Sequence, residues 1–382
     1  MSRHEKPMQR RLFKTRPFIL NKEKRKEIKR KVIEESGLNE ELKEKALNNI
    51  HKTEKELKQQ QRLSISKVKE RIKNWFESEQ ISFIENPLKE ISASKLTTYR
   101  GCPFAYFLRY ELRLEPEKKP YYLMAGQALH HVLAEFNRGN LNTLEELIDG
   151  KEIIENGKRK KILGWRAQWY KVANSDSIYF NKEEDKHIIY NNGVKLLKQF
   201  YGSEGRKPRQ KNYVEYKFTE KINLNGREYP FTGIFDYIDV DTNPPTIIDY
   251  KTGAELSEVT KDFCLQFTIY HLAYKRLREL NKIIVPSGDP NIVVYNLPLF
   301  SKTPEIKQYQ TTRNDVDVEY LIDVIKTVER GIIERNFVPF FGSTKFDHCK
   351  KCEWNYGNFC HNLLYSDDKE ILGFLEENKK IK

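Results

Sequence analysis

The sequence predicts an α/β protein built on a mixed sheet, and three observations support this prediction. Strand patterns dominate residues 213–251, with hairpin or turn signals at Asn225-Gly226 and at residues 241–245. Helical patterns come before and after these strands. A further strand is expected at about residues 292–299. The order helix, three strands, helix, strand is typical of a mixed sheet covered by helices.

The whole chain has the composition of a large, highly charged globular protein. Of its 382 residues, 38% are hydrophobic and 32% are charged, which is enough to build a substantial core. No run of about 18 apolar residues occurs, so no membrane association is expected. We expect no secretory signal, because the start has no apolar segment. The five cysteines then favour a reducing compartment, and we expect a cytoplasmic protein, nucleoid-associated if the source is prokaryotic.

The positive charge is concentrated in residues 1–90. These carry 24 Lys+Arg and 15 Asp+Glu, a net charge of +9 out of +13 for the chain. Residues 21–79 are rich in Lys, Glu, Gln and Leu, which predicts a basic helical extension. Such a segment either docks on DNA or a partner protein, or is a solvated and partly disordered leader; the pattern leaves both open.

A second domain is predicted for residues 91–382. A serine in Ser92-Ala93-Ser94 caps a first helix, and a second helix spans about Met124–Phe136. The second helix contains His130 and His131, whose side chains point about 100° apart, so at most one of them faces a common site. Residues 138–210 are expected to be a largely helical insertion. There, Trp165 and Trp169 share a helix face, which favours core packing over the stacking of nucleobases.

After the predicted strands, a helix is expected from about Ser257 to Leu280, and it contains Cys264, Gln266 and Tyr270. Gln266 and Tyr270 are four residues apart and therefore share a face. The strand at 292–299, another near 307–311 and a helix at about 316–336 complete the predicted core.

Two aspartates and a lysine converge where two predicted strands pair. Asp236 lies on one strand, and Asp249 and Lys251 point to one face of the next. Buried acids are costly unless a metal ion or a phosphate compensates them. Paired carboxylates that hold Mg²⁺ suit phosphodiester cleavage, with a lysine to orient the attacking water. The alternative is an ordinary Asp–Lys surface pair.

The tail contains Cys349, Cys352 and Cys360, one ligand short of a tetrahedral metal site. His348, His361 or Cys102 can supply the fourth ligand. Zinc and an iron–sulfur cluster both suit four thiolates. Cys264 is better explained as a packed residue.

Taken together, these motifs resemble the PD-(D/E)XK nucleases of the RecB/AddB type that carry an iron–sulfur cluster, a group that includes CRISPR-associated exonucleases and exonuclease V. The resemblance covers about residues 91–362. In chain order the matching motifs are Ser94-x₇-Cys102-Pro103 with Arg109 and Tyr110; Gly126-x₃-His130-x₂-Leu133; Glu215; Gly233-x₂-Asp236-x₂-Asp239; Asp249-Tyr250-Lys251-Thr252-Gly253; Gln266-x₃-Tyr270; and Cys349-x₂-Cys352-x₇-Cys360.

The resemblance implies a restriction-endonuclease-like core, in which a mixed central sheet is flanked by helices and an Fe–S clasp joins the two ends of the nuclease domain. It implies that the metal ligands are His130, Asp236, Asp249 and the Tyr250 carbonyl. Lys251 would position the attacking water, and Glu215, Gln266 and Tyr270 would complete the catalytic set. It also implies that Cys102, Cys349, Cys352 and Cys360 bind a 4Fe–4S cluster, with zinc as the competing interpretation.

The expected function is then that of a Mg²⁺- or Mn²⁺-dependent deoxyribonuclease, which acts as a single-strand exonuclease or processes DNA ends by two-metal-type hydrolysis. The alternative is a DNA-end-binding or assembly component of a helicase–nuclease or integration complex. The sequence has no Gly-x₄-Gly-Lys-Ser/Thr motif, so unwinding would need a helicase or another protein partner, contacted through residues 1–90.

Overall fold

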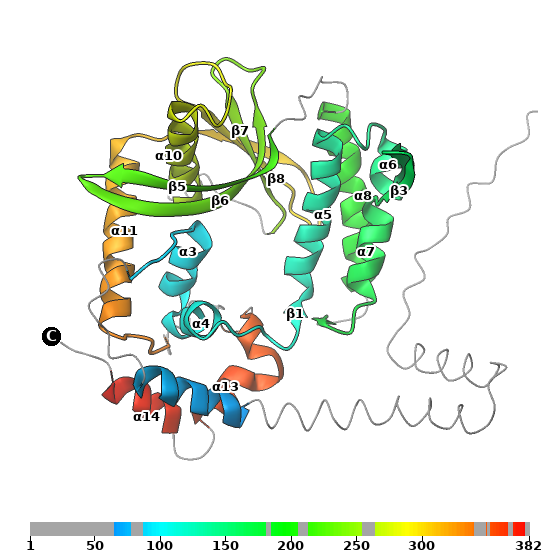
Figure 1. Ribbon diagram of the computed structural model, residues 1–382. Helices are drawn as coiled ribbons and strands as arrows, with labels where there is room; N and C mark the ends of the chain where they lie inside the picture. Colours follow the sequence, from blue (N-terminus) through cyan, green and yellow to red (C-terminus); the bar gives the residue numbers. More distant parts are fainter. Residues whose placement is uncertain are drawn as a thin grey trace, which may run out of the picture.

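The computed structural model (Figure 1) describes residues 65–77, 87–180, 185–204, 213–253, 264–339, 349, 352–365 and 370–378. Most of the predicted basic extension, residues 1–64 and 78–86, therefore lies outside the described residues, as do His348 and residues 254–263. Among the described helices, none combines the length and hydrophobicity that crossing a bilayer requires.

A five-stranded mixed sheet forms the centre of the molecule. Its strands are β5 (Val214–Leu224), β6 (Arg227–Asp239), β7 (Thr246–Lys251), β8 (Asn291–Asn296) and β9 (Lys307–Thr311), and they are ordered in space as in the sequence. Only β7 and β8 run parallel; the other neighbours are antiparallel. The predicted α/β class with a mixed sheet is confirmed.

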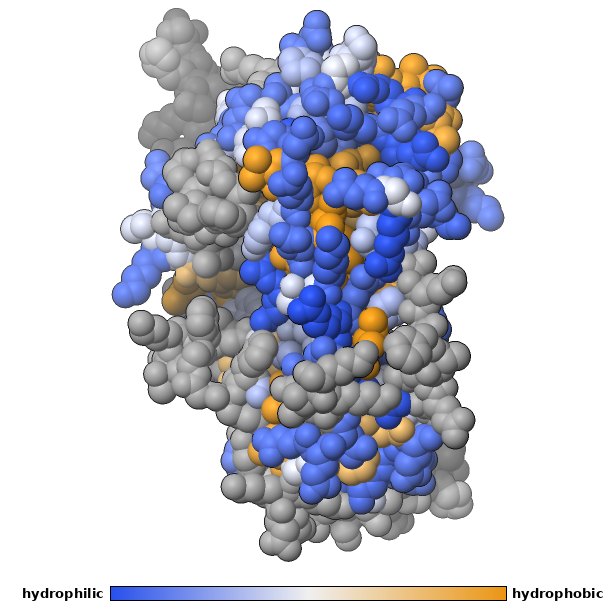
Figure 2. Space-filling model, turned by 90° about the vertical axis from the view of Figure 1, so that its left-hand side faces the viewer, coloured by the Kyte–Doolittle hydropathy of each residue, from blue (hydrophilic) through white to orange (hydrophobic). Residues whose placement is uncertain are grey.

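Helices cover both faces of this sheet (Figure 1). One face packs on α3 (Ala93–Gly101), α10 (Leu265–Glu279) and α11 (Asp315–Ile333), and the other on α5 (Tyr121–Asn137), α7 (Trp165–Ala173) and α8 (Asp185–Glu204). Alternation along β7 places Ile247 in the first core and Ile248 in the second. Figure 2 looks onto the side where α11 lies in Figure 1; hydrophilic residues predominate there, with hydrophobic ones visible between them.

The first helix begins as predicted, because the Ser92 hydroxyl accepts a hydrogen bond from the Lys95 amide at 3.3 Å. After α3 the chain continues through α4 (Pro103–Tyr106) and a π-helix (Phe107–Glu111). Residues 65–77 are helical and contribute to the same core, where Ile72 and Phe76 are buried. Arg335 donates a hydrogen bond to the Phe76 carbonyl at 2.9 Å. The end of the predicted extension thus packs against the same core as α3, α10 and α11.

Residues 138–210 hold α6 (Leu144–Asp149), α7, α8 and the short strand β4 (Ile178–Tyr179), but also a hairpin of β2 (Lys151–Glu155) and β3 (Lys158–Ile162). The helical prediction missed this hairpin. Its turn is Asn156-Gly157, both with positive φ, the same signal that correctly predicted the turn between β5 and β6. Trp165 and Trp169 are fully buried, with ring centroids 5.6 Å apart, as the core interpretation expects.

The predicted helix from Ser257 does not run unbroken to Leu280. Cys264 is extended and forms the N-cap of α10, so this helix begins at Leu265. At the end of the chain, the tail forms a 3₁₀ segment (Glu353–Asn358), α13 (Phe359–Tyr365) and α14 (Glu370–Glu377).

Candidate functional site

The predicted acidic residues lie where β6 and β7 separate. The two strands pair only through Tyr237–Ile248, Ile238–Ile247 and Asp239–Thr246, and the next positions along each are Asp236 and Asp249. We call this point the fork. Instead of a strand partner, the Tyr250 amide donates to the Asp236 carboxylate at 2.8 Å. The side chain of Asp236 thereby takes over a backbone hydrogen bond and is fixed in place.

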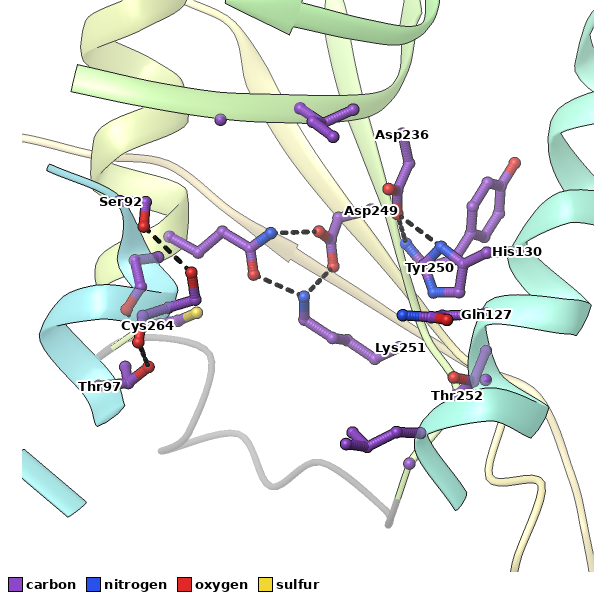
Figure 3. A pocket seen from close by; sticks show the side chains of 18 of the residues that line it. Ser92, Thr97, Gln127, His130, Asp236, Asp249, Tyr250, Lys251, Thr252 and Cys264 are labelled. Carbon is purple, nitrogen blue, oxygen red and sulfur yellow. Dashed lines mark hydrogen bonds and ion pairs between the residues drawn. The ribbon is translucent and has the colours of Figure 1, made fainter. Parts of the chain in front are cut away.

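On the α10 side of the fork, Asp249, Lys251 and Gln266 form one network, and Figure 3 shows Asp249 and Lys251 pointing toward each other. Lys251 Nζ lies 2.8 Å from Asp249 Oδ2 and donates to Gln266 Oε1 at 2.7 Å. Gln266 Nε2 lies 3.2 Å from Asp249 Oδ1 and 2.6 Å from the Tyr270 hydroxyl, which donates to the Ile234 carbonyl. The predicted shared face of Gln266 and Tyr270 therefore points at Asp249, which is only 1% exposed.

On the α5 side of the fork, His130, Glu215 and Asp236 come together. One ligand atom from each lies within 4.8 Å of the others, a spacing compatible with a shared metal ion. His130 Nδ1 is 3.5 Å from Asp236 Oδ2. Asp249 is not part of this trio, since Lys251 and Gln266 contact its oxygens. His131, the next residue on α5, is exposed and has Glu135 and Arg138 among its charged neighbours.

Glu215 reaches this position through an unusual backbone conformation. Its φ of 52° is in the left-handed region, which costs a non-glycine residue about 1–3 kcal/mol. Tyr216 and Phe235 on one side of it pack in the first core, while Val214 and Tyr237 on the other pack in the second. The β5–β6 pair therefore changes face between these positions, and this switch coincides with Glu215 and Asp236.

Two glycines of the predicted motifs have clear packing roles. A Cβ on Gly126 would lie 2.6 Å from Thr252 Oγ1, so glycine lets α5 approach the end of β7. A Cβ on Gly233 would lie 2.6 Å from the Phe218 ring. The sequence motifs indicated both glycines only by resemblance. Gly126 meets Thr252 from a segment far along the chain, whereas Phe218 is the cross-strand partner of Gly233 in the β5–β6 pair.

The electrostatics separate the two aspartates. Burial raises the pKa of Asp249 to about 6, against the opposing effect of Lys251. Burial also acts to raise the pKa of Asp236, but hydrogen bonds from His130 and the Tyr250 amide outweigh it and lower this pKa. Burial alone would lower the pKa of His130, yet Asp236 and Asp249 raise it. Asp236 is thus held as an anion, while Asp249 takes up a proton more readily than an ordinary aspartate.

A second group of candidate ligands is formed by Cys102, Cys349, Cys352 and Cys360, here called the cysteine group. Cys102 precedes α4, Cys352 precedes the 3₁₀ segment, and both pack with Cys360 against the first core. The pKa of Cys352 is raised to about 11, mainly by burial and to a smaller extent by the nearby Cys102 and Cys349. Burial also raises the pKa of Cys360, and the other three thiols each add to the shift. Cys360 therefore lies within electrostatic range of the other three thiols.

Cys264 lies apart from the cysteine group. Burial raises the pKa of its thiol, and the charged groups nearest to it are Lys251 and Asp249 of the fork. An ion pair between Arg109 and Glu353 adds a further link from the Cys102 segment to the tail.

The model of the PD-(D/E)XK nuclease superfamily matches residues 90–361, and the chain belongs to this superfamily. The predicted resemblance is thus confirmed at the level of the family.

The chain is also similar to curated proteins whose names describe a component of an ATP-dependent helicase/deoxyribonuclease. It is 30% identical to that of Carboxydothermus hydrogenoformans over 229 residues, which cover 53% of this chain and 20% of the relative. Identity to that of Alkaliphilus oremlandii is 28% over 238 residues, or 52% of this chain and 20% of the relative. Identity to that of Alkaliphilus metalliredigens is 26% over 329 residues, which cover 73% of this chain and 27% of the relative. The matched part spans about a fifth to a quarter of these relatives.

Proposed function

We propose that this chain is a DNA nuclease that hydrolyses phosphodiester bonds with bound Mg²⁺ or Mn²⁺. The observation that carries this proposal is the fork, where the His130–Glu215–Asp236 trio faces the Asp249–Lys251 pair. Membership of the PD-(D/E)XK superfamily supports phosphodiester cleavage. The relatives, whose names include deoxyribonuclease, support DNA as the substrate.

The donor set fits a hard divalent cation. Carboxylate and carbonyl oxygens with one imidazole nitrogen suit Mg²⁺ or Mn²⁺, and we assign His130, Asp236, Asp249 and the Tyr250 carbonyl as the ligands. Glu215, beside His130 and Asp236, is assigned to hold a metal-bound water or a further coordination position. When bound, the metal ion supplies charge neutralisation at the phosphate and a lowered pKa for the attacking water.

The chain's own residues supply the orientation. Lys251 is held between Asp249 and Gln266 at 2.8 and 2.7 Å, so its ammonium group has few positions open to it. From there it can hold the attacking water and stabilise negative charge that develops on the phosphate. Gln266 and Tyr270 fix Lys251 and Asp249 through their hydrogen bonds.

We further assign a 4Fe–4S cluster to the cysteine group. The support is that the other three thiols each raise the pKa of Cys360 and that Cys102, Cys352 and Cys360 pack against one core, together with the chemistry of four soft thiolates. Cys102 and Cys349 are 247 positions apart, so a cluster here would close a very long loop and stabilise the domain. Its role is then structural, and zinc is the alternative occupant.

A helicase partner is the remaining element of the proposal. The names of the relatives combine helicase with deoxyribonuclease, and the matched part of this chain corresponds to a small share of their length. We propose that unwinding comes from a separate protein or domain, and that this chain degrades the resulting single strand. Residues 1–90, with a net charge of +9, are the proposed docking segment for DNA or for that partner.

The test is an assay with an end-labelled single-stranded oligonucleotide in Mg²⁺, in Mn²⁺ and in EDTA. We expect cleavage with either metal and none in EDTA, and slower cleavage of the matching blunt duplex. Binding without cleavage under every metal condition would reject the nuclease and favour the alternative, a DNA-end-binding or assembly component.

A further inference from the structure

A large cavity extends from the fork between α3 and α5. Its volume is about 1970 Å³, well above the roughly 300–1,000 Å³ of sites for small molecules. Figure 3 looks into it, with Ser92 and Thr97 on the α3 side, Gln127 and His130 on the α5 side, and Asp249 and Lys251 between them. The size suits a segment of a polymer.

One face of α5 forms a wall of the cavity. Tyr122, Gly126, His130, Ala134 and Arg138 all line it and follow one another at four-residue intervals, which places them on one side of the helix. His130 is eight residues from Tyr122, or about 12 Å along the helix axis. This wall therefore leads from the acidic residues to the N-terminal end of α5.

At that end the lining is aromatic. Tyr121, Tyr122, Tyr179 and Phe300 line the cavity and are only partly buried. Tyr121 stacks on Phe180 with ring centroids 5.1 Å apart and meets the edge of Phe300 at 5.8 Å. These contacts fix the Tyr121 ring on two sides, so the group is organised before a ligand binds.

Tyr179 is held from two other elements. It lies on β4, which pairs with the residues just before α5 (β1, Lys119–Pro120), and its ring centroid is 4.9 Å from that of Tyr356. Tyr356 is in the 3₁₀ segment that follows Cys352. The cysteine-bearing tail thus supports the aromatic end of the cavity.

The wall formed by α3 has a different chemistry. Ser94, Thr97 and Arg100 line the cavity and are exposed, whereas Leu96 and Tyr99 on the other side of the helix are buried. Arg100 brings a positive charge to this wall. One wall therefore offers aromatic faces, and the opposite wall offers polar groups and a cation.

Resting on the proposed nuclease function, we propose that this cavity is a groove for single-stranded DNA. Bases stack on Tyr122 and Tyr179, and the phosphate backbone passes along α3 near Arg100. Aromatic stacking needs base faces that a duplex keeps hidden between base pairs, so this arrangement selects single strands. At about 3.4 Å per stacked nucleotide, the platform is about three to four nucleotides from the scissile phosphate.

The test measures binding in EDTA, where no cleavage interferes, by fluorescence anisotropy of labelled dT12. Tyr122→Ala and Tyr179→Ala should each weaken binding about tenfold through the loss of one stacked base, while Tyr122→Phe keeps the ring and should bind as wild type does. The matched control is Tyr170→Ala, because Tyr170 is 47% exposed on α7 and does not line the cavity.

Abasic substitution of dT12 provides the second measurement. Bases are removed at successive positions of the strand. At one short stretch, the loss of a base should weaken binding by wild type about tenfold and leave binding by the Tyr122→Ala/Tyr179→Ala double variant unchanged. Equal binding of intact and abasic strands by wild type, or equal competition by a duplex, would overturn the stacking groove. Cleavage in Mg²⁺ separates this proposal from the proposed nuclease function. If the strand is cleaved but no base stacks, only the stacking groove is rejected, because a groove that contacts phosphates alone can still present a strand for hydrolysis.

Discussion

The fork and the cysteine group are built in opposite ways. At the fork, Asp236 and Asp249 come from adjacent strands and are fixed by short hydrogen bonds to Tyr250, Lys251 and Gln266. The cysteine group instead draws its residues from short helical segments at the two ends of the domain, where Cys102 and Cys349 are 247 positions apart in the sequence. Strand pairing sets the geometry of the first, while the meeting of the two ends of the domain sets that of the second.

This difference predicts different consequences of substitution. The fork concentrates charge in a buried place at a cost to stability. Removing a carboxylate there should therefore abolish cleavage without destabilising the fold. The proposed cluster would link distant parts of the chain through the cysteine group, so removing a thiol should act on the fold first.

Asp249→Asn should lower the cleavage rate by about 10³-fold or more, because a metal ligand and its charge are lost. The midpoint of thermal unfolding should stay the same or rise, since burial already raises the pKa of Asp249 to about 6 and disfavours its charge. Single-turnover cleavage and calorimetry measure the two effects. Asp323→Asn on the exposed side of α11 is the control; a strongly destabilised Asp249→Asn would contradict the division.

Lys251→Met should lower cleavage by about 10²–10³-fold while Mn²⁺ still binds. Lys251 lowers the pKa of Asp249, so its removal should raise that pKa and move the pH midpoint of Mn²⁺ binding upward. Titration calorimetry across pH measures this. Complete loss of Mn²⁺ binding at high pH would show that Lys251 supports the metal site itself.

Cys360→Ser should bleach the brown colour expected of the cluster and lower the unfolding midpoint by roughly 10 °C. The proposed cluster closes the loop between Cys102 and Cys349, which are 247 positions apart. In the chain-entropy account, closing a loop of this length raises the free energy of unfolding by about 5 kcal/mol. Cys264→Ser, beside the fork, should keep both colour and stability. Iron, sulfide and zinc analysis decides the occupant: a colourless wild type with one zinc would keep the clasp and reject the cluster.

Deleting residues 1–64 should weaken DNA binding several-fold and reduce its dependence on salt, because these residues carry 19 Lys+Arg and 10 Asp+Glu, a net charge of +9. The cut leaves residues 65–77 in place, since Ile72 and Phe76 belong to the core. Anisotropy at several salt concentrations measures the effect. An insoluble product would show that the deleted segment is needed for folding.

Sequence patterns predicted which residues meet at the fork, but they did not predict its detailed geometry. Alternation and the turn after β6 were enough to bring Asp236 beside Asp249, and helix periodicity placed Gln266 and Tyr270 on one face. No local pattern indicates that β6 and β7 stop pairing there, or that Asp236 accepts from the Tyr250 amide. The left-handed Glu215 is likewise set by the change of face within the sheet, a tertiary effect.

Two other features were not predicted, the β2–β3 hairpin and the aromatic end of the cavity, and the reasons differ. The hairpin at Asn156-Gly157 could have been predicted, because the same dipeptide marked the turn at Asn225-Gly226. The aromatic end of the cavity could not, since Tyr122, Tyr179 and Phe300 are far apart in the sequence and meet only in the folded chain.

The most direct test of the fork as a catalytic metal centre is anomalous diffraction from crystals soaked in Mn²⁺. We predict a peak at about 2.0–2.3 Å from the ligand atoms of His130 and Asp236, with Asp249 turned to reach it, and no such peak in Asp236→Asn crystals. A peak bound elsewhere, or a fork that stays empty at saturating Mn²⁺ while the protein still cleaves DNA, would contradict the account.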